Sequence, residues 1–260
     1  MAKKRGQKLK LSFSRRCMIE FLNVSKEVSL NSVSAEKFLE LTPLINARQK
    51  CPVKVSWYAI FLKAFAKVSA QYPELRQSYF RFPKPFIYQY HRTVGMLAIE
   101  REVDQETMVM YLKVDSPEKN PLLHIDQVIK KSKDCAVESE PSFLRFLKFN
   151  RLPFLLRRLC WWLGMNMPTK KLHYFGTFGL TGLGLGVRSL SVKSPLPISF
   201  VFDMSQTEQK PLVRLFWDHR IFDGIVVISF FKELERILNV EIVAELNELT
   251  KKMIQVEEAV

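Results

Sequence analysis

A short stretch near the carboxyl end, residues 216–224 with the sequence FWDHRIFDG, constrains this chain most. Apolar and polar side chains alternate before it over residues 212–216, which predicts a β-strand. After it, apolar residues recur at helical spacing over residues 225–238. The stretch therefore predicts a strand that leads almost directly into a helix, and His219, one of only four histidines, falls at that corner.

The residue types alone leave three interpretations of His219 open. In the first interpretation His219 is a packed core side chain, since a lone histidine beside apolar residues is often part of the core. In the second it is a general base, because its ordinary pKa near neutrality suits proton transfer from a thiol or hydroxyl. In the third it binds a metal with Asp223, but no third ligand stands nearby in the sequence. The residue types therefore leave the first two interpretations open, and we expect no metal site.

The residues around His219 match a known pattern. Asp218, His219, Arg220, Asp223 and Gly224 resemble the Asp-His-Arg-x-x-Asp-Gly signature of dihydrolipoamide acyltransferase catalytic domains, which are relatives of chloramphenicol acetyltransferase. Glycerolipid acyltransferases also pair a histidine with an aspartate, but with four residues between them. Only three residues intervene here, so the spacing disfavours that class.

The resemblance implies roles for the residues of this motif. His219 would be the general base, with its tautomer fixed by its own backbone carbonyl. Asp223 would belong to the same catalytic site without being the middle member of a protease-type triad. It would hold the loop through an ion pair with an arginine near the chain start. The Arg-x-x-Ile pattern of the family's opening helix is matched at Arg16, with Arg15 as the second candidate.

A glycine-rich segment, residues 176–186, holds the other half of the expected site. A dinucleotide-binding loop is disfavoured, because the strand-helix context and the acidic residue that such loops require are missing. The segment instead resembles the family's Gly-x-Phe-Thr-Ile-Ser-x-x-Gly loop. In that register Thr181 supplies the hydroxyl that hydrogen-bonds the tetrahedral oxyanion. Gly182 departs from the family, which has a larger residue there.

The resemblance also implies a fold, an assembly and an activity. The fold would be α/β, similar to chloramphenicol acetyltransferase, with a mixed sheet flanked by helices. Three copies would form a homotrimer in which His219 of one subunit faces Thr181 of its neighbour. The activity would be acyl transfer from a thioester to a thiol or hydroxyl. Because no lipoyl domain or long Ala/Pro-rich linker is present, we expect coenzyme A or an acyl carrier as donor, and no tightly bound cofactor.

Length and composition fit one globular domain, which we place at residues 11–260 after a basic tail at residues 1–10. Of 260 residues 47% are hydrophobic and 25% charged. The four cysteines lack C-x-x-C spacing and are expected to be reduced thiols. The amino-terminal residues lack an apolar signal segment, so we expect a cytoplasmic location.

The net charge of +14 predicts attraction to polyanions. Coenzyme A phosphates, an acidic carrier protein and an anionic membrane all qualify. Nucleic acid is not expected, since no nucleic-acid-binding motif accompanies the charge.

Residues 143–163 combine many large apolar side chains with arginines and lysines at near-helical intervals. Pro153 divides the segment into two predicted helices, and the charges exclude a membrane-spanning helix. Two interpretations stay open. The segment is a buried subunit contact, or it lies flat on an anionic membrane with Trp161 and Trp162 at headgroup depth, which would make the protein peripheral there.

Periodicity predicts the remaining elements. Helices are expected at residues 12–22, 34–47, 56–68, 122–131 and 241–255. Strands are expected at residues 24–30, 87–99, 107–114, 198–204 and 211–217. The alternative to an enzyme is a catalytically silent scaffold, or a peripheral membrane-binding protein, on the same fold. Because both His219 and a hydroxyl at position 181 are present, we expect an enzyme.

Overall fold

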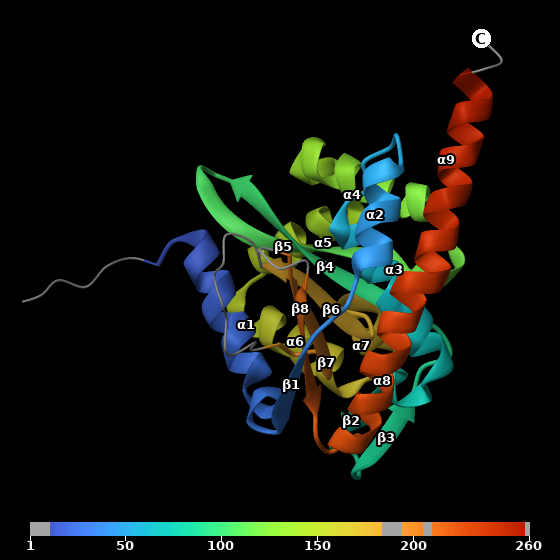
Figure 1. The fold of residues 1–260 in the computed structure, drawn as a ribbon. Coiled ribbons are helices and arrows are strands. Elements are labelled where there is room, and N and C mark those ends of the chain that lie inside the picture. The colour runs from blue at the N-terminus through green and yellow to red at the C-terminus, as the bar shows by residue number, and fades with distance from the viewer. Residues whose placement is uncertain (1–10, 184–193, 205–209, 258–260) are drawn as a thin grey trace, which may run out of the picture.

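The computed structural model describes residues 11–183, 194–204 and 210–257. Six of the described strands form one sheet in the order β1-β8-β7-β6-β4-β5 (Figure 1). Strand β6 runs parallel to both β4 and β7, and the other neighbours pair antiparallel. The strands are β1 (Ser32–Phe38), β4 (Val94–Val103), β5 (Glu106–Asp115), β6 (Phe178–Leu183), β7 (Ile198–Asp203) and β8 (Leu212–Asp218). The α/β class with a mixed sheet is therefore as predicted.

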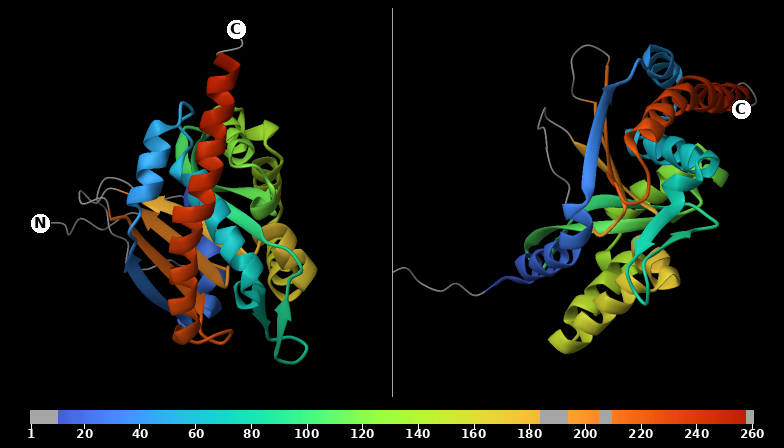
Figure 2. Two further views of the ribbon diagram at one scale, coloured as in Figure 1. Left: turned by 45° about the vertical axis from the view of Figure 1, so that its right-hand side comes forward. Right: turned by 90° about the horizontal axis from the view of Figure 1, so that it is seen from below.

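Helices cover both sides of this sheet. In Figure 2, α3, α8 and α9 lie on one side, and α1, α6 and α7 lie on the other. A separate two-stranded sheet, β2 (Gln77–Phe80) with β3 (Phe86–Gln89), lies beside the main sheet. The α-helices are α1 (Phe13–Leu30), α2 (Thr42–Lys50), α3 (Trp57–Gln71), α4 (Leu122–Asp134), α5 (Pro141–Arg151), α6 (Phe154–Asn166), α7 (Pro168–Phe175), α8 (Gly224–Arg236) and α9 (Val243–Glu257). A π-helical turn, Ile237–Ile242, joins the last two helices.

The centre of the core is the contact of α3 with the middle strands. Ser56 begins α3 by accepting a hydrogen bond from the backbone N–H of Ala59. The Phe65 ring then packs against Phe178 and Phe200, with centroids 4.6 and 4.9 Å away. Truncating one such buried aromatic residue typically costs about 3–5 kcal/mol. This packing fixes β6, which carries Thr181, and β7, which pairs with the strand that leads to His219.

Several predicted elements are confirmed. The strand before His219 is β8 and the helix after it is α8. Strands β4 and β5 form the predicted hairpin, and the predicted break at Pro153 separates α5 from α6.

The amino-terminal prediction is wrong at two places. Residues 24–30, predicted as a strand, are the second half of α1, and the helix predicted from residue 34 begins with strand β1. In the second half of α1, Ser25 and Val28 are buried, so packing against the rest of the chain supports a longer helix. Strand β1 pairs along its whole length with β8, from Ser32 opposite Asp218 to Phe38 opposite Leu212. This ladder outweighs the helix propensity of its Ala-Glu-Lys sequence, because propensities are small beside tertiary pairing.

The glycine-rich segment is also different from the prediction. Its residues 178–183 form β6 in the middle of the sheet, whereas a loop was expected; residues 184–186 lie outside the described residues. Gly176, with φ at +74°, ends the preceding helix. A side chain at Gly182 would place its Cβ 2.7 Å from the Tyr58 hydroxyl and 2.8 Å from Phe202. The departure from the family at Gly182 therefore makes room for Tyr58 of α3.

Candidate active site

The backbone holds the corner at the end of β8 in place on both sides. Asp218 N–H donates to the Pro197 carbonyl at 2.9 Å, and His219 N–H donates to the Asn31 carbonyl at 2.9 Å. The Trp217 indole stacks on Phe222 and donates to its carbonyl at 2.9 Å, which closes the turn across His219. Thus His219 follows a strand whose position is fixed by its neighbours.

Asp218 and Arg220 form the buried support of this corner. The Asp218 side chain is only 2% exposed and accepts hydrogen bonds from the Arg220 guanidinium at 2.6 and 2.9 Å. The guanidinium also lies over the Tyr79 ring, 4.1 Å from its centroid. A carboxylate this deeply buried requires a cation beside it. The motif therefore holds the Arg220 side chain in place as well as His219.

The imidazole of His219 is directed outward, with half of the side chain (50%) exposed. Its Nδ1 lies 3.4 Å from an Asp223 carboxylate oxygen, slightly beyond the usual hydrogen-bond range. Asp223 is itself 79% exposed and begins helix α8. The predicted bond from the ring to the His219 backbone carbonyl is not among the hydrogen bonds of the described residues. The group that faces Nδ1 is the Asp223 carboxylate, not the backbone carbonyl of His219.

The predicted ion pair between Arg16 and Asp223 is not formed in the chain. Arg16 donates to the Asn150 carbonyl at 3.2 Å and packs on the Phe13 ring, both in the region where α1 meets α5. Because α1 continues to Leu30, its first turn lies far along the helix from the His219 corner. The signature residue at position 16 thus contributes to helix packing in this chain.

Thr181 lies in β6, far from His219 of the same chain. It pairs with Val201 of β7, which in turn pairs with Arg214 of β8, five residues before His219. At about 3.4 Å per residue along a strand and about 4.8 Å between strands, the two side chains are about 20 Å apart. One carbonyl carbon cannot contact both groups at this distance. Any site that uses both residues must take one of them from another copy.

The segment at residues 143–163 divides its charges between the interior and the surface. Arg157 is buried, donates to both carboxylate oxygens of Glu20 on α1, and also donates to the Leu152 carbonyl. Arg158 is exposed, beside an apolar face of α6 in which Leu155 is 75% exposed. Periodicity predicted the two helices but not that Arg157 is an internal structural residue.

Two features of the described residues bear on other kinds of chemistry. They contain no cluster of three or more histidine, cysteine, aspartate or glutamate side chains that could hold a metal ion. Burial raises the pKa of Cys17 to about 11, so this thiol stays protonated near neutral pH and is a poor nucleophile.

Among the described helices, none combines the length and the hydropathy needed to cross a bilayer.

Comparison with known proteins identifies the fold. No family model matches the sequence, and no curated protein sequence is significantly similar to it. Solved structures do match over nearly the whole chain. The dihydrolipoamide acetyltransferase of Azotobacter vinelandii superposes with a TM-score of 0.61 at 16% identity, covering 94% of this chain and 95% of that one.

Two further structures agree with this match. The catalytic core of the 2-oxoacid dehydrogenase multienzyme complex from Thermoplasma acidophilum superposes with a TM-score of 0.62 at 14% identity, covering 90% of this chain and 99% of that one. A probable dihydrolipoamide acetyltransferase from Listeria monocytogenes superposes with a TM-score of 0.58 at 14% identity, covering 95% of this chain and 96% of that one. The chain therefore has the fold of dihydrolipoamide acyltransferase catalytic cores, as the resemblance implied.

Proposed function

We propose that this chain is an acyltransferase whose active sites form between copies of the chain. The donor is a thioester of coenzyme A or of an acyl carrier, and the acceptor is a thiol or a hydroxyl. The observation that carries the proposal is the His219 corner. There a half-exposed imidazole stands at the end of β8, which backbone hydrogen bonds fix, and a carboxylate lies beside its Nδ1.

The chemistry assigns one task to each group. With Nδ1 protonated and facing Asp223, Nε2 of His219 takes the proton from the acceptor as its sulfur or oxygen attacks the thioester carbonyl. The hydroxyl of Thr181 donates to the oxyanion that develops on the carbonyl oxygen. Collapse of the intermediate breaks the carbon–sulfur bond, and the departing thiolate receives the proton from the imidazolium. The acyl group is thereby transferred without a metal or resident cofactor.

The structural relatives support this assignment. In the Azotobacter vinelandii enzyme, a serine, a histidine and an asparagine were investigated for their role in the catalytic mechanism, and the last two are four positions apart. His219 and Asp223 have the same spacing, and Thr181 provides a hydroxyl in place of serine. Another relative forms the cubic core of the pyruvate dehydrogenase multienzyme complex. A homotrimer with the site between subunits also accounts for the separation of about 20 Å between His219 and Thr181.

Complementation between two inactive variants tests the shared site. His219→Ala and Thr181→Val are each expected to be inactive as pure oligomers in a thioester-exchange assay with acyl-CoA, acyl carrier and acyl-lipoamide donors. Co-expression should restore activity, because some interfaces then combine an intact histidine with an intact threonine. Mixing two preparations of His219→Ala is the control. A co-expressed pair that stays inactive contradicts the shared site, and a parent inactive on every donor favours the silent scaffold.

We also propose that the exposed face of α6 contacts an anionic membrane, which would make the protein peripheral there. The observation behind this is the exposed row that includes Leu155 and Trp162, next to Arg158. A basic residue near such a surface contributes about 1 kcal/mol. Sedimentation with neutral and anionic vesicles, at low and high salt, should show anionic recruitment that Arg158→Glu weakens. Equal binding to both lipids, or no effect of salt, would contradict membrane binding and favour a subunit contact for α6.

A further inference from the structure

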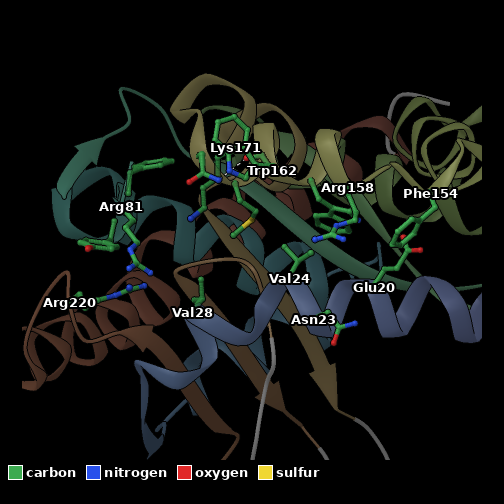
Figure 3. Close-up of a pocket in the computed structure, with 15 residues that line it drawn as sticks. Glu20, Asn23, Val24, Val28, Arg81, Phe154, Arg158, Trp162, Lys171 and Arg220 are labelled. Atoms are coloured by element: carbon green, nitrogen blue, oxygen red, sulfur yellow. Dashed lines mark hydrogen bonds between the residues drawn. The ribbon is translucent and has the colours of Figure 1, made fainter. Parts of the chain in front are cut away.

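A cavity of about 570 Å³ lies between helices α1 and α6, close to the His219 corner but separate from it. Figure 3 shows α1 along one side, α6 and α7 along the other, and Arg81 and Arg220 at one end. The volume is typical of sites that hold small molecules. Because a single chain encloses it, this cavity does not depend on a second copy, unlike the proposed active site.

The charged side chains of the cavity wall are almost all cationic. Arg81, Arg158, Lys171 and Arg220 line it, and Glu20 is the one carboxylate among the described residues of the lining. Arg157 compensates the charge of Glu20 and Asp218 that of Arg220, which leaves an excess of positive charge along the described part of the wall. Cations gathered in a concave site with low-dielectric walls focus a positive potential there. The cavity therefore favours an anion.

The distribution of these cations indicates where the anion would bind. The guanidinium groups of Arg81 and Arg220 point toward one another at one end of the cavity (Figure 3). Arg220 is held rigidly by Asp218 and Tyr79, whereas Arg81 forms no ion pair with any described residue. Because Asp218 already compensates the charge of Arg220, Arg81 adds the excess positive charge at this end, and a phosphate or carboxylate there gains charge-assisted hydrogen bonds.

Apart from Asn23 and Asn166, the rest of the described wall is apolar or aromatic. Val24 and Val28 come from α1, and Phe154, Trp162 and Met165 come from α6. The Trp162 ring contacts Phe82 at 5.8 Å and is half exposed, so it lies where the cavity meets the surface. An inorganic anion would leave these side chains unused. A ligand that uses the entire wall has an apolar chain attached to its anionic group.

We propose that this cavity binds a single-chain anionic amphiphile. Its phosphate or carboxylate lies between Arg81 and Arg220, and its chain runs along Val24 towards Phe154 and Trp162. The binding itself needs no catalysis. A role for the ligand as substrate rests on the proposed acyl transfer, since Arg220 directly follows His219 and brings the anionic end beside the catalytic corner.

Titration calorimetry with defined probes tests the binding. Dodecyl phosphate and laurate, each as monomers, are expected to bind, and these two arms distinguish a phosphate from a carboxylate headgroup. Inorganic phosphate lacks the chain and dodecyltrimethylammonium reverses the charge, so both should bind at least about tenfold more weakly. The His219→Ala variant should bind dodecyl phosphate like the parent, which separates this result from the fate of the acyltransferase proposal.

Two variants and a matched control locate the site. Arg81→Glu should weaken dodecyl phosphate binding about tenfold or more, whereas Lys148→Glu, the same charge reversal on the exposed face of α5, should change it less than about twofold. Val24→Phe narrows the cavity and should weaken chain-bearing probes while leaving inorganic phosphate unaffected. Equal affinity for the cationic probe, or equal losses in Arg81→Glu and Lys148→Glu, would overturn the proposal.

A vesicle arm identifies the source of the ligand. Neutral phosphatidylcholine vesicles with and without lysophosphatidic acid are compared with monomeric dodecyl phosphate. Competition by the vesicles that contain lysophosphatidic acid would show extraction from a bilayer. Competition by the monomer alone would indicate a free amphiphile.

Discussion

The His219 corner and the α1–α6 cavity share a boundary at Arg220 but differ in construction. At the corner the side chains of His219 and Asp223 are exposed, and the expected partner Thr181 lies about 20 Å away in the same chain. The cavity is concave, and a single chain completes its cationic and apolar wall. The two proposals therefore place acyl transfer at a surface that requires a second copy, and ligand binding at a site that each copy carries.

Removal of the His219 imidazole should have the largest effect, because it abolishes the proposed catalysis at the corner without changing the cavity. His219→Ala is expected to lower the rate of acyl transfer about 10²–10⁴-fold, the contribution of general base catalysis. The side chain is half exposed, and the Trp217 ring 6.4 Å from it also stacks on Phe222, so the thermal midpoint should stay close to that of the parent. Steady-state kinetics and calorimetric unfolding measure both quantities. An unaltered turnover would remove His219 from the mechanism.

Asp218→Asn should damage the support that the two regions share. This change removes the ion pair between Asp218 and Arg220, and breaking one side of a buried ion pair typically costs about 3–5 kcal/mol of unfolding free energy. The control is Asp115→Asn, whose carboxylate is exposed and pairs with Arg92 at 3.5 Å, and which should cost less than about 1 kcal/mol. Urea titrations measure both variants. Equal costs would mean that the buried ion pair of Asp218 with Arg220 stabilises the fold no more than the exposed pair.

Arg16 and Asp223 should behave as independent residues. Since Arg16 contacts Asn150 and Phe13, the unfolding free energies of Arg16→Ala, Asp223→Ala and the double variant should add within about 0.5 kcal/mol. Coupling larger than that would restore the ion pair that the sequence suggests, in a state of the assembly in which the two side chains meet.

The smallest expected effect concerns His173 on α7. Desolvation, with the charges of Arg145 and Lys113, lowers the pKa of His173 below its ordinary value of 6.5. As the pH falls through 6.5 towards this lowered value, the unfolded chain binds a proton that the folded chain does not, so stability decreases. Urea titrations above and below pH 6.5 should show a smaller decrease for His173→Gln. An equal decrease would assign the pH dependence to other groups.

Much of this fold follows from local patterns. Strand β8, helix α8, the β4–β5 hairpin and the division between α5 and α6 were predicted from periodicity and prolines, because these signals act within a few residues. Strand β1 and the second half of α1 were missed. Their conformations depend on pairing with β8 and on packing against the rest of the chain, which no local pattern contains.

The candidate sites divide in the same way. The motif around His219 is contiguous, so the sequence alone placed the histidine, Asp218 and Arg220 at one corner. The cavity is assembled from residues as far apart as Val24, Arg81, Trp162 and Arg220, and only the tertiary structure brings them together. The sequence determined which groups this protein can use for chemistry. Packing over long separations decided which groups face one another, because each such contact depends on where all the other elements lie.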